Sequence, residues 1–184
     1  FMDMVVETER LLLRKMVPGD FENLCRILQD EAVMYAYEGA FTDEEVHSWL
    51  DRQLNRYRED GIGLWAVLLK ESGEMIGQCG LTMQEIPGKR VPEIGYLFEK
   101  KYWHKGYAAE AAAAVKEYAF GVLGLEEVFS IIRDTNIASQ KVAKRNKMTR
   151  TGMFVKQYRG VDMPHYIFSV SRGAFPSAAE QTDE

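Results

Sequence analysis

The sequence predicts a single α/β domain built on a mixed β-sheet, and two patterns within its 184 residues carry that prediction. Two apolar segments, Leu64–Lys70 and Met75–Leu81, flank a turn that contains a glycine, which is typical of an antiparallel hairpin. Farther along, the strand candidates Glu93–Glu99 and Glu126–Arg133 are separated by a long helix, which predicts a parallel crossover. We therefore expect a mostly antiparallel sheet that becomes parallel near its middle and is flanked by helices.

The first part of the chain predicts one strand and two helices. Arg10–Met16 is a short apolar segment, and Pro18-Gly19-Asp20 ends it and begins a helix with apolar residues on one face. Thr42 and Glu45 form a capping-box pattern. Apolar residues then recur at helical spacing as far as Gly61, so we expect a second helix that packs on the sheet.

The middle of the chain contains the central strand and the main helix. The polar stretch Gln84–Arg90 is expected to link the hairpin to the strand Glu93–Glu99, giving three strands in a meander. An alanine-rich run from Tyr107 favours helix more strongly than any other segment. The next strand then returns parallel to the central one.

The last part of the chain predicts a short helix and a second hairpin. Asn136 to about Asn146 forms the helix, and Met153–Tyr158 and Tyr166–Ser171 form the strands. We expect residues 1–172 to make one domain. Residues 173–184 are small and polar, so we expect them to form a mobile tail.

Composition excludes several functional classes. Apolar residues make up 46% and charged residues 28% of the chain, and no apolar run approaches the ~20 residues that span a membrane. A formal charge of −5 argues against nucleic acid as the main ligand. Cys25 and Cys79 lie in apolar patterns, so we expect two buried thiols and a cytoplasmic protein without a secretion signal.

The turn before the main helix has the features of an anion site. The first turn of a helix leaves about four backbone N–H groups without partners and carries partial positive charge, which suits a phosphate. Gly106 and Ala108 keep side chains out of the way, and Lys101 and Lys105 add charge. The alternative is a strand-to-helix connection that simply requires a glycine.

The segment Trp103-His104-Lys105-Gly106-Tyr107-Ala108 resembles the Q/R-x-x-G-x-G/A loop of the GNAT superfamily of acetyl-CoA-dependent N-acyltransferases. It is closest in form to the branch similar to ribosomal-protein N-terminal acetyltransferases, although Trp103 replaces the commoner Gln or Arg. The resemblance extends from Glu7 to about Arg172. It implies the GNAT fold, acetyl-CoA as cosubstrate and no metal, with the coenzyme diphosphate bound by His104, Lys105, Gly106, Tyr107 and Ala108.

The resemblance also implies where the rest of the coenzyme binds. In GNAT proteins the strand matching Glu93–Glu99 carries a bulge and splays from its neighbour, so that free backbone groups pair with pantetheine amides. Here Tyr96, Leu97 and Phe98 would supply them, while their side chains stay in the core.

The segment Asn136-Ile137-Ala138-Ser139-Gln140-Lys141-Val142 is similar to the N-x-x-S-x-x-V element of the family. Asn136 would bind the pantetheine arm and Ser139 would protonate the departing thiolate, because Ala143 stands where many members have a tyrosine acid. Lys144 belongs to a basic cluster, Lys141–Arg150, that either neutralises the 3′-phosphate or forms a solvated helix face.

Amine acetylation also requires a proton acceptor, because α-amines and lysines are mostly protonated at neutral pH. Glu93 matches an acidic position common in this branch and could act directly or through a water. The alternative is an exposed glutamate beside Arg90. Asp134 fits a turn better than a base, and neither His104 nor His165 has a partner that the sequence reveals.

The sequence leaves the acceptor open. The resemblance favours a protein N-terminal α-amine, but a small-molecule amine such as a polyamine, amino acid or aminoglycoside would need only different loops around residues 30–42 and 156–164. Tyr35, Tyr37 and Phe41 lie in the first of these segments and either border the acceptor or close the core. A non-catalytic acyl-CoA-binding module is the third alternative, and a homodimer is compatible with all three.

Overall fold

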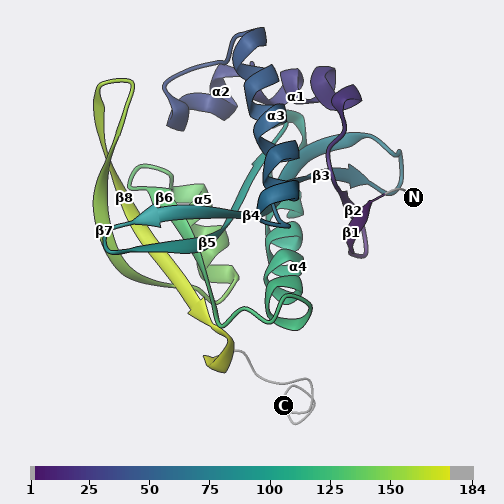
Figure 1. Ribbon diagram of the computed structural model, residues 1–184. Helices are drawn as coiled ribbons and strands as arrows, with labels where there is room; N and C mark the ends of the chain where they lie inside the picture. Colours follow the sequence, from purple (N-terminus) through teal and green to yellow (C-terminus); the bar gives the residue numbers. More distant parts are fainter. Residues whose placement is uncertain (1–2, 175–184) are drawn as a thin grey trace.

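The computed structural model describes residues 3–174 and contains an eight-stranded sheet flanked by helices (Figure 1). The strands are β1 (Met4–Glu7), β2 (Leu11–Arg14), β3 (Leu64–Leu69), β4 (Met75–Ile86), β5 (Lys89–Phe98), β6 (Glu127–Arg133), β7 (Thr149–Tyr158) and β8 (Val161–Ser171). The α-helices are α1 (Phe21–Leu28), α2 (Glu31–Met34), α3 (Asp43–Glu59), α4 (Tyr107–Gly121) and α5 (Ile137–Arg145).

The sheet has the strand order β1-β2-β3-β4-β5-β6-β8-β7, and its neighbours are antiparallel except for the β5–β6 pair. The helix α4 connects these two parallel strands. The predicted mixed sheet is therefore confirmed. The strand β1 was not predicted, because four residues give too short a pattern to separate a strand from a loop.

The β4–β5 pair and the final hairpin, β7–β8, are longer than the sequence predicts. β4 and β5 pair without interruption from Gly77–Phe98 to Ile86–Lys89, so the polar stretch expected as a connection is the end of a β-ribbon. The ribbon closes at Pro87-Gly88, where Gly88 has a φ of 86° that favours glycine. Strands that extend beyond the core need no apolar alternation. The sequence of residues 84–90 therefore lacks the pattern that predicts a strand.

The second hairpin is closed by Arg159-Gly160, and both residues have positive φ, 51° and 77°. Two successive left-handed residues make the tight turn that matches strand twist. Residues 156–158 and 161–164, expected as part of an acceptor loop, therefore belong to β7 and β8.

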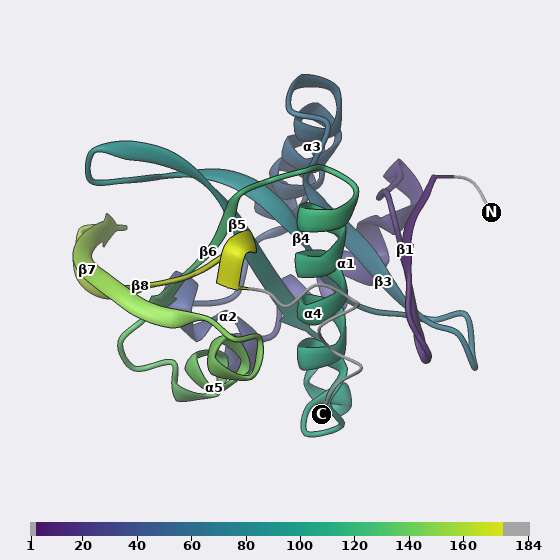
Figure 2. The same ribbon diagram turned by 90° about the horizontal axis from the view of Figure 1, so that it is seen from below.

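Helices cover both faces of the sheet (Figure 2), and an apolar core lies beneath them on each face. On one face α4 packs through its buried alanines and Val115 against residues such as Trp65. On the other face α1, α2 and α3 pack against residues such as Leu64 and Ala66. Since successive strand residues face opposite sides, each central strand contributes to both cores.

Helix α3 begins as the sequence predicts. The Thr42 hydroxyl accepts a hydrogen bond from the Glu45 N–H at 3.2 Å, and the Glu45 carboxylate accepts one from the Thr42 N–H at 3.1 Å. The helix is fixed to the sheet by Trp49, whose indole N–H donates to the Gln78 side-chain oxygen at 3.0 Å.

Cys25 and Cys79 are free thiols, and Cys79 is buried as expected, whereas Cys25 is only half-buried. Across residues 3–174, no helix is both long and apolar enough to cross a membrane. The predicted tail lies almost wholly outside the described residues, and only its first two residues, Gly173 and Ala174, are seen, in a short 3₁₀ turn.

Candidate active site

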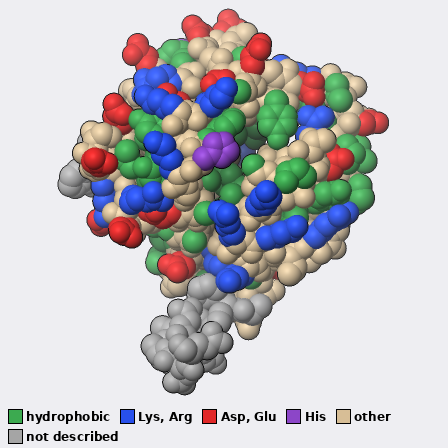
Figure 3. All heavy atoms as spheres, turned by 180° about the vertical axis from the view of Figure 1, so that it is seen from behind, with side chains coloured by type: hydrophobic (Ala, Val, Ile, Leu, Met, Phe, Trp, Pro, Cys, Tyr) green, Lys and Arg blue, Asp and Glu red, His purple; other side chains and the backbone are tan. Residues whose placement is uncertain are grey.

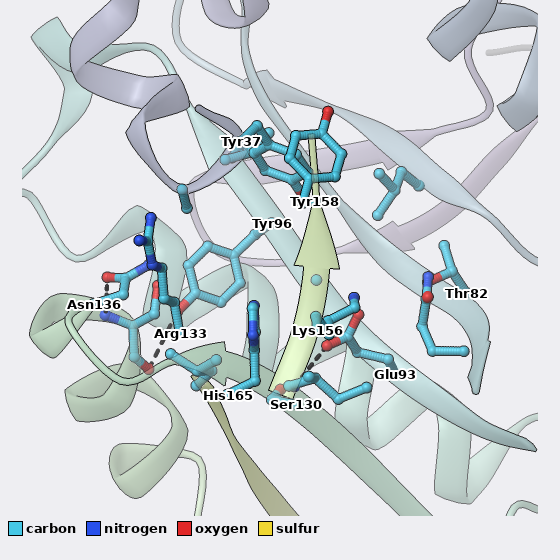
Figure 4. A pocket seen from close by; sticks show the side chains of 18 of the residues that line it. Tyr37, Thr82, Glu93, Tyr96, Ser130, Arg133, Asn136, Lys156, Tyr158 and His165 are labelled. Carbon is cyan, nitrogen blue, oxygen red and sulfur yellow. Dashed lines mark hydrogen bonds between the residues drawn. The ribbon is translucent and has the colours of Figure 1, made fainter. Parts of the chain in front are cut away.

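The parallel strands β5 and β6 are joined at one point and separate beyond it. Glu93 and Phe129 are their one aligned pair, whereas β4 and β5 share ten. Next to the aligned pair, where the gap begins, the Ser130 hydroxyl donates a hydrogen bond to the Ile94 carbonyl at 2.9 Å. A cavity of about 340 Å³ occupies the gap, with lining residues from β4, β5, β6, β7, β8, α3 and the start of α5 (Figure 4).

The cavity passes from one face of the sheet to the other. Leu97 packs with the core beneath α1, α2 and α3, whereas Tyr96 packs with the core beneath α4, and both line the cavity. Glu93 lies four positions before Leu97 on β5, and because side chains alternate along a strand, both face the α3 side of the sheet. The Tyr96 hydroxyl donates to the Ser139 carbonyl at 3.4 Å, on the α5 side. Two groups of reactants can thus meet in the gap from opposite faces.

Glu93 lies at the junction of β5 and β6, not on the surface. Its carboxylate accepts a hydrogen bond from the Ile131 backbone N–H at 2.6 Å. Burial raises the pKa of Glu93 to about 7, against the opposing effects of this hydrogen bond and of the Lys156 and Arg56 charges. Arg90, the neighbour proposed in the alternative interpretation, pairs instead with Asp60 at 3.7 Å. A carboxyl with this pKa can accept a proton near neutral pH.

The backbone of β5 offers hydrogen-bonding groups to the gap. The Glu99 N–H donates to the Ile76 carbonyl at 2.9 Å, so by antiparallel alternation Leu97 bonds toward β4 while Tyr96 and Phe98 point the other way, into the gap. Leu97 is therefore badly oriented for the role predicted for its backbone. The expected bulge is also missing, since the β4–β5 register is continuous along the strand.

Trp103 occupies part of this edge. Its indole N–H donates to the Phe98 carbonyl at 2.9 Å. The N–H and C=O of Tyr96 and the N–H of Phe98 thus remain directed at the gap, where the amides of a pantetheine arm could pair with them.

The turn before α4 is shaped as an anion site would need. His104 and Gly106 have φ values of 63° and 81°, and the first backbone bond of the helix runs from the Glu110 N–H to the Gly106 carbonyl at 3.0 Å. The N–H groups of Tyr107 and Ala108 precede that bond and are available to a ligand. His104, Lys105 and Gly106 are exposed, as a diphosphate site requires.

Arg10 holds this turn from the N-terminal segment. Its guanidinium donates to the Lys105 carbonyl at 3.0 Å and to the Glu110 carboxylate at 2.7 Å, and it lies 4.3 Å from the Tyr107 ring centroid. Thr8 adds a hydrogen bond to Glu110 at 2.6 Å. This link cannot be predicted from sequence patterns, because about a hundred residues separate its partners.

Asn136 caps α5, with its side-chain oxygen accepting a hydrogen bond from the Ser139 N–H at 3.1 Å. Both residues line the cavity. Lys144 lies farther along α5 and lines a second hollow of about 330 Å³ with Gln140 and Arg150. Of the predicted coenzyme residues, Tyr96, Leu97, Asn136 and Ser139 line the cavity, whereas Phe98, Lys144 and the α4 turn lie outside its lining.

His165 is a cavity residue that the sequence did not reveal. It lies opposite Arg133 of β6 and Phe154 of β7, so the three share one face of the sheet. Its Nδ1 lies 2.8 Å from the Met163 carbonyl, and since a carbonyl only accepts, Nδ1 carries the proton and Nε2 is an acceptor. Burial, with the charges of Lys156 and Arg133, lowers the pKa of His165, which keeps the ring neutral. Finding this residue required the strand register.

Of the aromatic residues after α2, some border the cavity and one closes the core, which are the two predicted roles. Phe41 is buried in the core beneath α1–α3. Tyr37 lines the cavity with its ring edge-on to Trp49 and Tyr158, and burial raises the pKa of Tyr37 to about 12. Tyr35, which is partly exposed, lines the same cavity. Asp134 lies in a turn, where its carbonyl accepts a hydrogen bond from Gln140 at 2.9 Å.

Metal ligands are not assembled in the part of the chain that the structure describes: no group of three or more His, Cys, Asp or Glu side chains could hold an ion there.

Comparisons with known proteins agree with this architecture. A family model described as an acetyltransferase (GNAT) domain matches residues 10–149. An uncharacterized N-acetyltransferase of Bacillus subtilis, YnaD, is 32% identical over 154 residues, which are 83% of this chain and 87% of that protein. The crystal structure of a GNAT-family acetyltransferase from Bacillus anthracis is 27% identical, with a TM-score of 0.76 over 90% of this chain and 97% of that one.

A more distant structure shares the fold. RimL, described as a ribosomal L7/L12 alpha-N-protein acetyltransferase in complex with coenzyme A, is 17% identical, with a TM-score of 0.77 over 94% of this chain and 100% of that one. The family match, the YnaD relationship and the split sheet agree, and the chain therefore belongs to the GNAT family of acetyltransferases, enzymes that use acetyl-CoA as cosubstrate.

Proposed function

We propose that the protein transfers the acetyl group of acetyl-CoA to a primary amine by direct attack, with Glu93 as proton acceptor and Ser139 as proton donor. The observation that carries the proposal is that Glu93 and Ser139 line one cavity, while the two faces of the sheet present them from opposite sides. An amine and a thioester can therefore meet there without an intermediate on the enzyme.

The cosubstrate supplies a thioester, and the chain supplies orientation and proton transfer. The backbone groups of Tyr96 and Phe98 that face the gap hold the pantetheine arm, with Asn136 beside it. The turn from His104 to Ala108 receives the diphosphate on its N–H groups. Lys144 and its hollow lie on the same side and would meet the 3′-phosphate.

The reaction exchanges a C–S bond for a C–N bond. The amine nitrogen attacks the thioester carbonyl and its proton passes to Glu93, which is ionised above a pKa of about 7. The sulfur leaves with the C–S electron pair and takes the proton of the Ser139 hydroxyl. Exchange with solvent then restores the Ser139 proton and removes the one held by Glu93. A backbone N–H of β5 directed at the gap stabilises the carbonyl oxygen during attack.

His165 offers a second acceptor for the amine proton. Its neutral ring has an acceptor nitrogen, and it lies on the acceptor side of the cavity with Arg133. Glu93 is preferred because its pKa is raised toward neutrality, whereas the pKa of His165 is lowered and makes that ring the weaker base.

We further propose a protein N-terminal α-amine as the acceptor. The shared fold with RimL and the resemblance of the α4 turn support this choice. A small-molecule amine is the alternative, supported by a relative from Aspergillus fumigatus, named FsC-acetyl coenzyme A-N(2)-transacetylase, that is 29% identical over 154 residues. The cavity is compatible with both.

A thiol-release screen with peptides and small amines tests the proposal. We expect release with acetyl-CoA and at least one amine class, and loss of most of it in Glu93→Gln and Ser139→Ala. Binding of acetyl-CoA with no release from any amine would favour a non-catalytic acyl-CoA-binding module. Light scattering of the same preparation tests whether the protein forms a homodimer.

A further inference from the structure

The cavity is far more cationic than the chain as a whole. Its lining includes Arg52 and Arg56 of α3, Arg133 of β6 and Lys156 of β7, which we call the cavity cations, against the single carboxylate of Glu93. The whole chain has a formal charge of −5. Seen from behind, the surface has Lys and Arg side chains gathered around a hollow with a histidine at its edge (Figure 3). Such a concentration attracts negative charge.

Three of the four cavity cations have no carboxylate partner among the described residues, unlike several cations elsewhere. Arg10, Arg14 and Lys70 pair with carboxylates at 2.6–2.8 Å. Within residues 3–174, by contrast, Arg52, Arg56 and Lys156 have no ion pair. Arg56 donates only to the neutral side chain of Gln53, at 3.1 Å.

Arg133 has one distant carboxylate partner and one buried donor without an acceptor. It approaches the Glu38 carboxylate at 3.4 Å, and its Nε is buried without a hydrogen-bond partner among the described residues. A buried N–H without an acceptor is unfavourable by about 1–3 kcal/mol, more when charged, and an anionic ligand would remove that penalty. The guanidinium fork suits a carboxylate in particular.

The positive and negative groups lie in an order that fits a molecule with both charges. In Figure 4 Arg133 lies beside Asn136, whereas Lys156 lies beside Glu93, and His165 lies between them. Glu93 is at the junction of β5 and β6, where the amine must arrive. An acceptor bound with its amine at Glu93 would place its remaining atoms among the cations.

We infer that the acceptor carries a carboxylate in the same molecule as its amine, held by Arg133 with support from the other cavity cations. This inference rests on the proposed function and specifies its substrate class. Two sources have this chemistry: a free amino acid, and a protein N-terminus with an acidic side chain in its first residues. Polyamines and aminoglycosides, which bring several positive charges, are disfavoured by the same cavity.

The test compares amines that differ only in the carboxylate. One arm uses free amino acids and their carboxamides, and the other uses N-terminal peptides with Glu or Gln at the second position. We expect the kcat/KM of the carboxylate form to exceed that of its neutral form by about 10- to 100-fold, the effect of one charge-assisted hydrogen bond. The arm that shows this ratio identifies the source.

Two variants and a control assign the effect to the cavity. Arg133→Gln and Lys156→Gln should reduce the acid-to-amide ratio by about 10-fold or more, mainly through the KM of the acceptor, and leave the KM of acetyl-CoA unchanged. Arg58→Gln removes the same charge from the exposed side of α3 and should leave the ratio intact.

Contrary outcomes separate this inference from the proposed function. Turnover of carboxamides or polyamines as fast as carboxylates overturns the inference and leaves acetyl transfer in place. If no amine releases thiol, the proposed acetyl transfer is rejected. Calorimetry with coenzyme A and paired N-acetylated acids and amides then tests whether the cavity still binds a carboxylate. Equal binding of acid and amide there would also end the inference.

Discussion

The Glu93 carboxylate accepts a hydrogen bond from the Ile131 backbone N–H at 2.6 Å, beside the single aligned pair that joins β5 to β6. A side chain thus takes the place of a ladder bond at the point where the sheet divides. This arrangement keeps a carboxylate in the gap, fixed in direction, with its pKa raised to about 7 by burial. The proposed proton acceptor and the opening of the sheet therefore lie at the same point of the structure.

The rate should follow the ionisation of Glu93. We expect kcat/KM for the acceptor to rise with pH through about 7, because only the ionised carboxylate accepts a proton. Glu93→Gln should lower kcat/KM by about 10²- to 10⁴-fold and remove this limb, leaving only the titration of the amine. A pH–rate profile checks this, with Glu85→Gln on the exposed ribbon as the control. An unchanged limb near pH 7 in Glu93→Gln would transfer the role to another group.

The ionisation of Glu93 should also make the stability of the fold depend on pH. The direction is opposite to that of most carboxylates, because the folded-state pKa is raised. The pKa of Glu93 is about 7 when folded and near 4.5 when unfolded, so the folded state binds more protons between these values. The native protein therefore loses stability as pH rises from about 4.5 to about 7. Relative to it, Glu93→Gln should gain urea resistance across that window. A pH-independent difference between the two midpoints would show that Glu93 does not titrate there.

Variants of Ser139 and Asn136 should have different effects, the first on the rate of reaction and the second on stability and coenzyme binding. Ser139→Ala keeps the backbone N–H that Asn136 caps, so it should lower kcat by about 10²-fold without changing the unfolding midpoint. Asn136→Ala removes the cap and should destabilise the protein by about 1 kcal/mol while raising the KM for acetyl-CoA. Steady-state kinetics and urea unfolding measure both. Full kcat in Ser139→Ala would end its assignment as proton donor.

The turn before α4 should bind coenzyme through its N–H groups. Gly106→Asp places a carboxylate and a side chain at a φ of 81°, and the added Cβ would lie 3.4 Å from Arg10 Nη2. Gly124→Asp imposes similar strain and the same charge beyond the other end of α4, at a φ of 68° in open space. We expect only Gly106→Asp to weaken coenzyme A binding, by about 10-fold or more in calorimetry. Equal affinities would place the diphosphate elsewhere.

The Arg10–Glu110 ion pair should stabilise the fold in a pH-dependent way. Burial alone would raise the pKa of Glu110, but hydrogen bonds from Thr8 and Arg10 outweigh it and lower the value. The contribution is therefore complete above about pH 4.5 and is lost as pH falls through the folded pKa. Glu110→Gln should destabilise the protein by about 1–3 kcal/mol at pH 7 and not at low pH. Exposed Glu71→Gln should have no such effect at either pH.

The fold could be predicted because its signals are local. The alanine-rich α4, the Thr42–Glu45 capping box and the glycine turn at Gly73 each depend on residues close in sequence. Their order gives the crossover and the hairpin. The strand conformation of residues 84–90 could not be predicted in this way, because a ribbon outside the core shows no apolar alternation.

The candidate site could be predicted only in part. Asn136, Ser139 and Glu93 stand in patterns that the chain displays, but the orientation of Leu97 depends on where the β4–β5 turn falls. Arg133 and His165 become neighbours only through the β6–β8 register, which composition does not specify. The cationic lining therefore required the assembled sheet.

The cavity that crosses the sheet has a consequence for how such a protein can diversify. In the proposed arrangement, the α4 and α5 side would bind the acetyl-CoA that such enzymes share, whereas α2, α3 and the β7–β8 ribbon would bind the acceptor, which differs from one enzyme to the next. Because the sheet separates these sets, substitutions in one leave the other's packing undisturbed. A new substrate can be acquired by remodelling one side alone, and exchange of residues 30–42 between relatives is the engineering route that this layout opens.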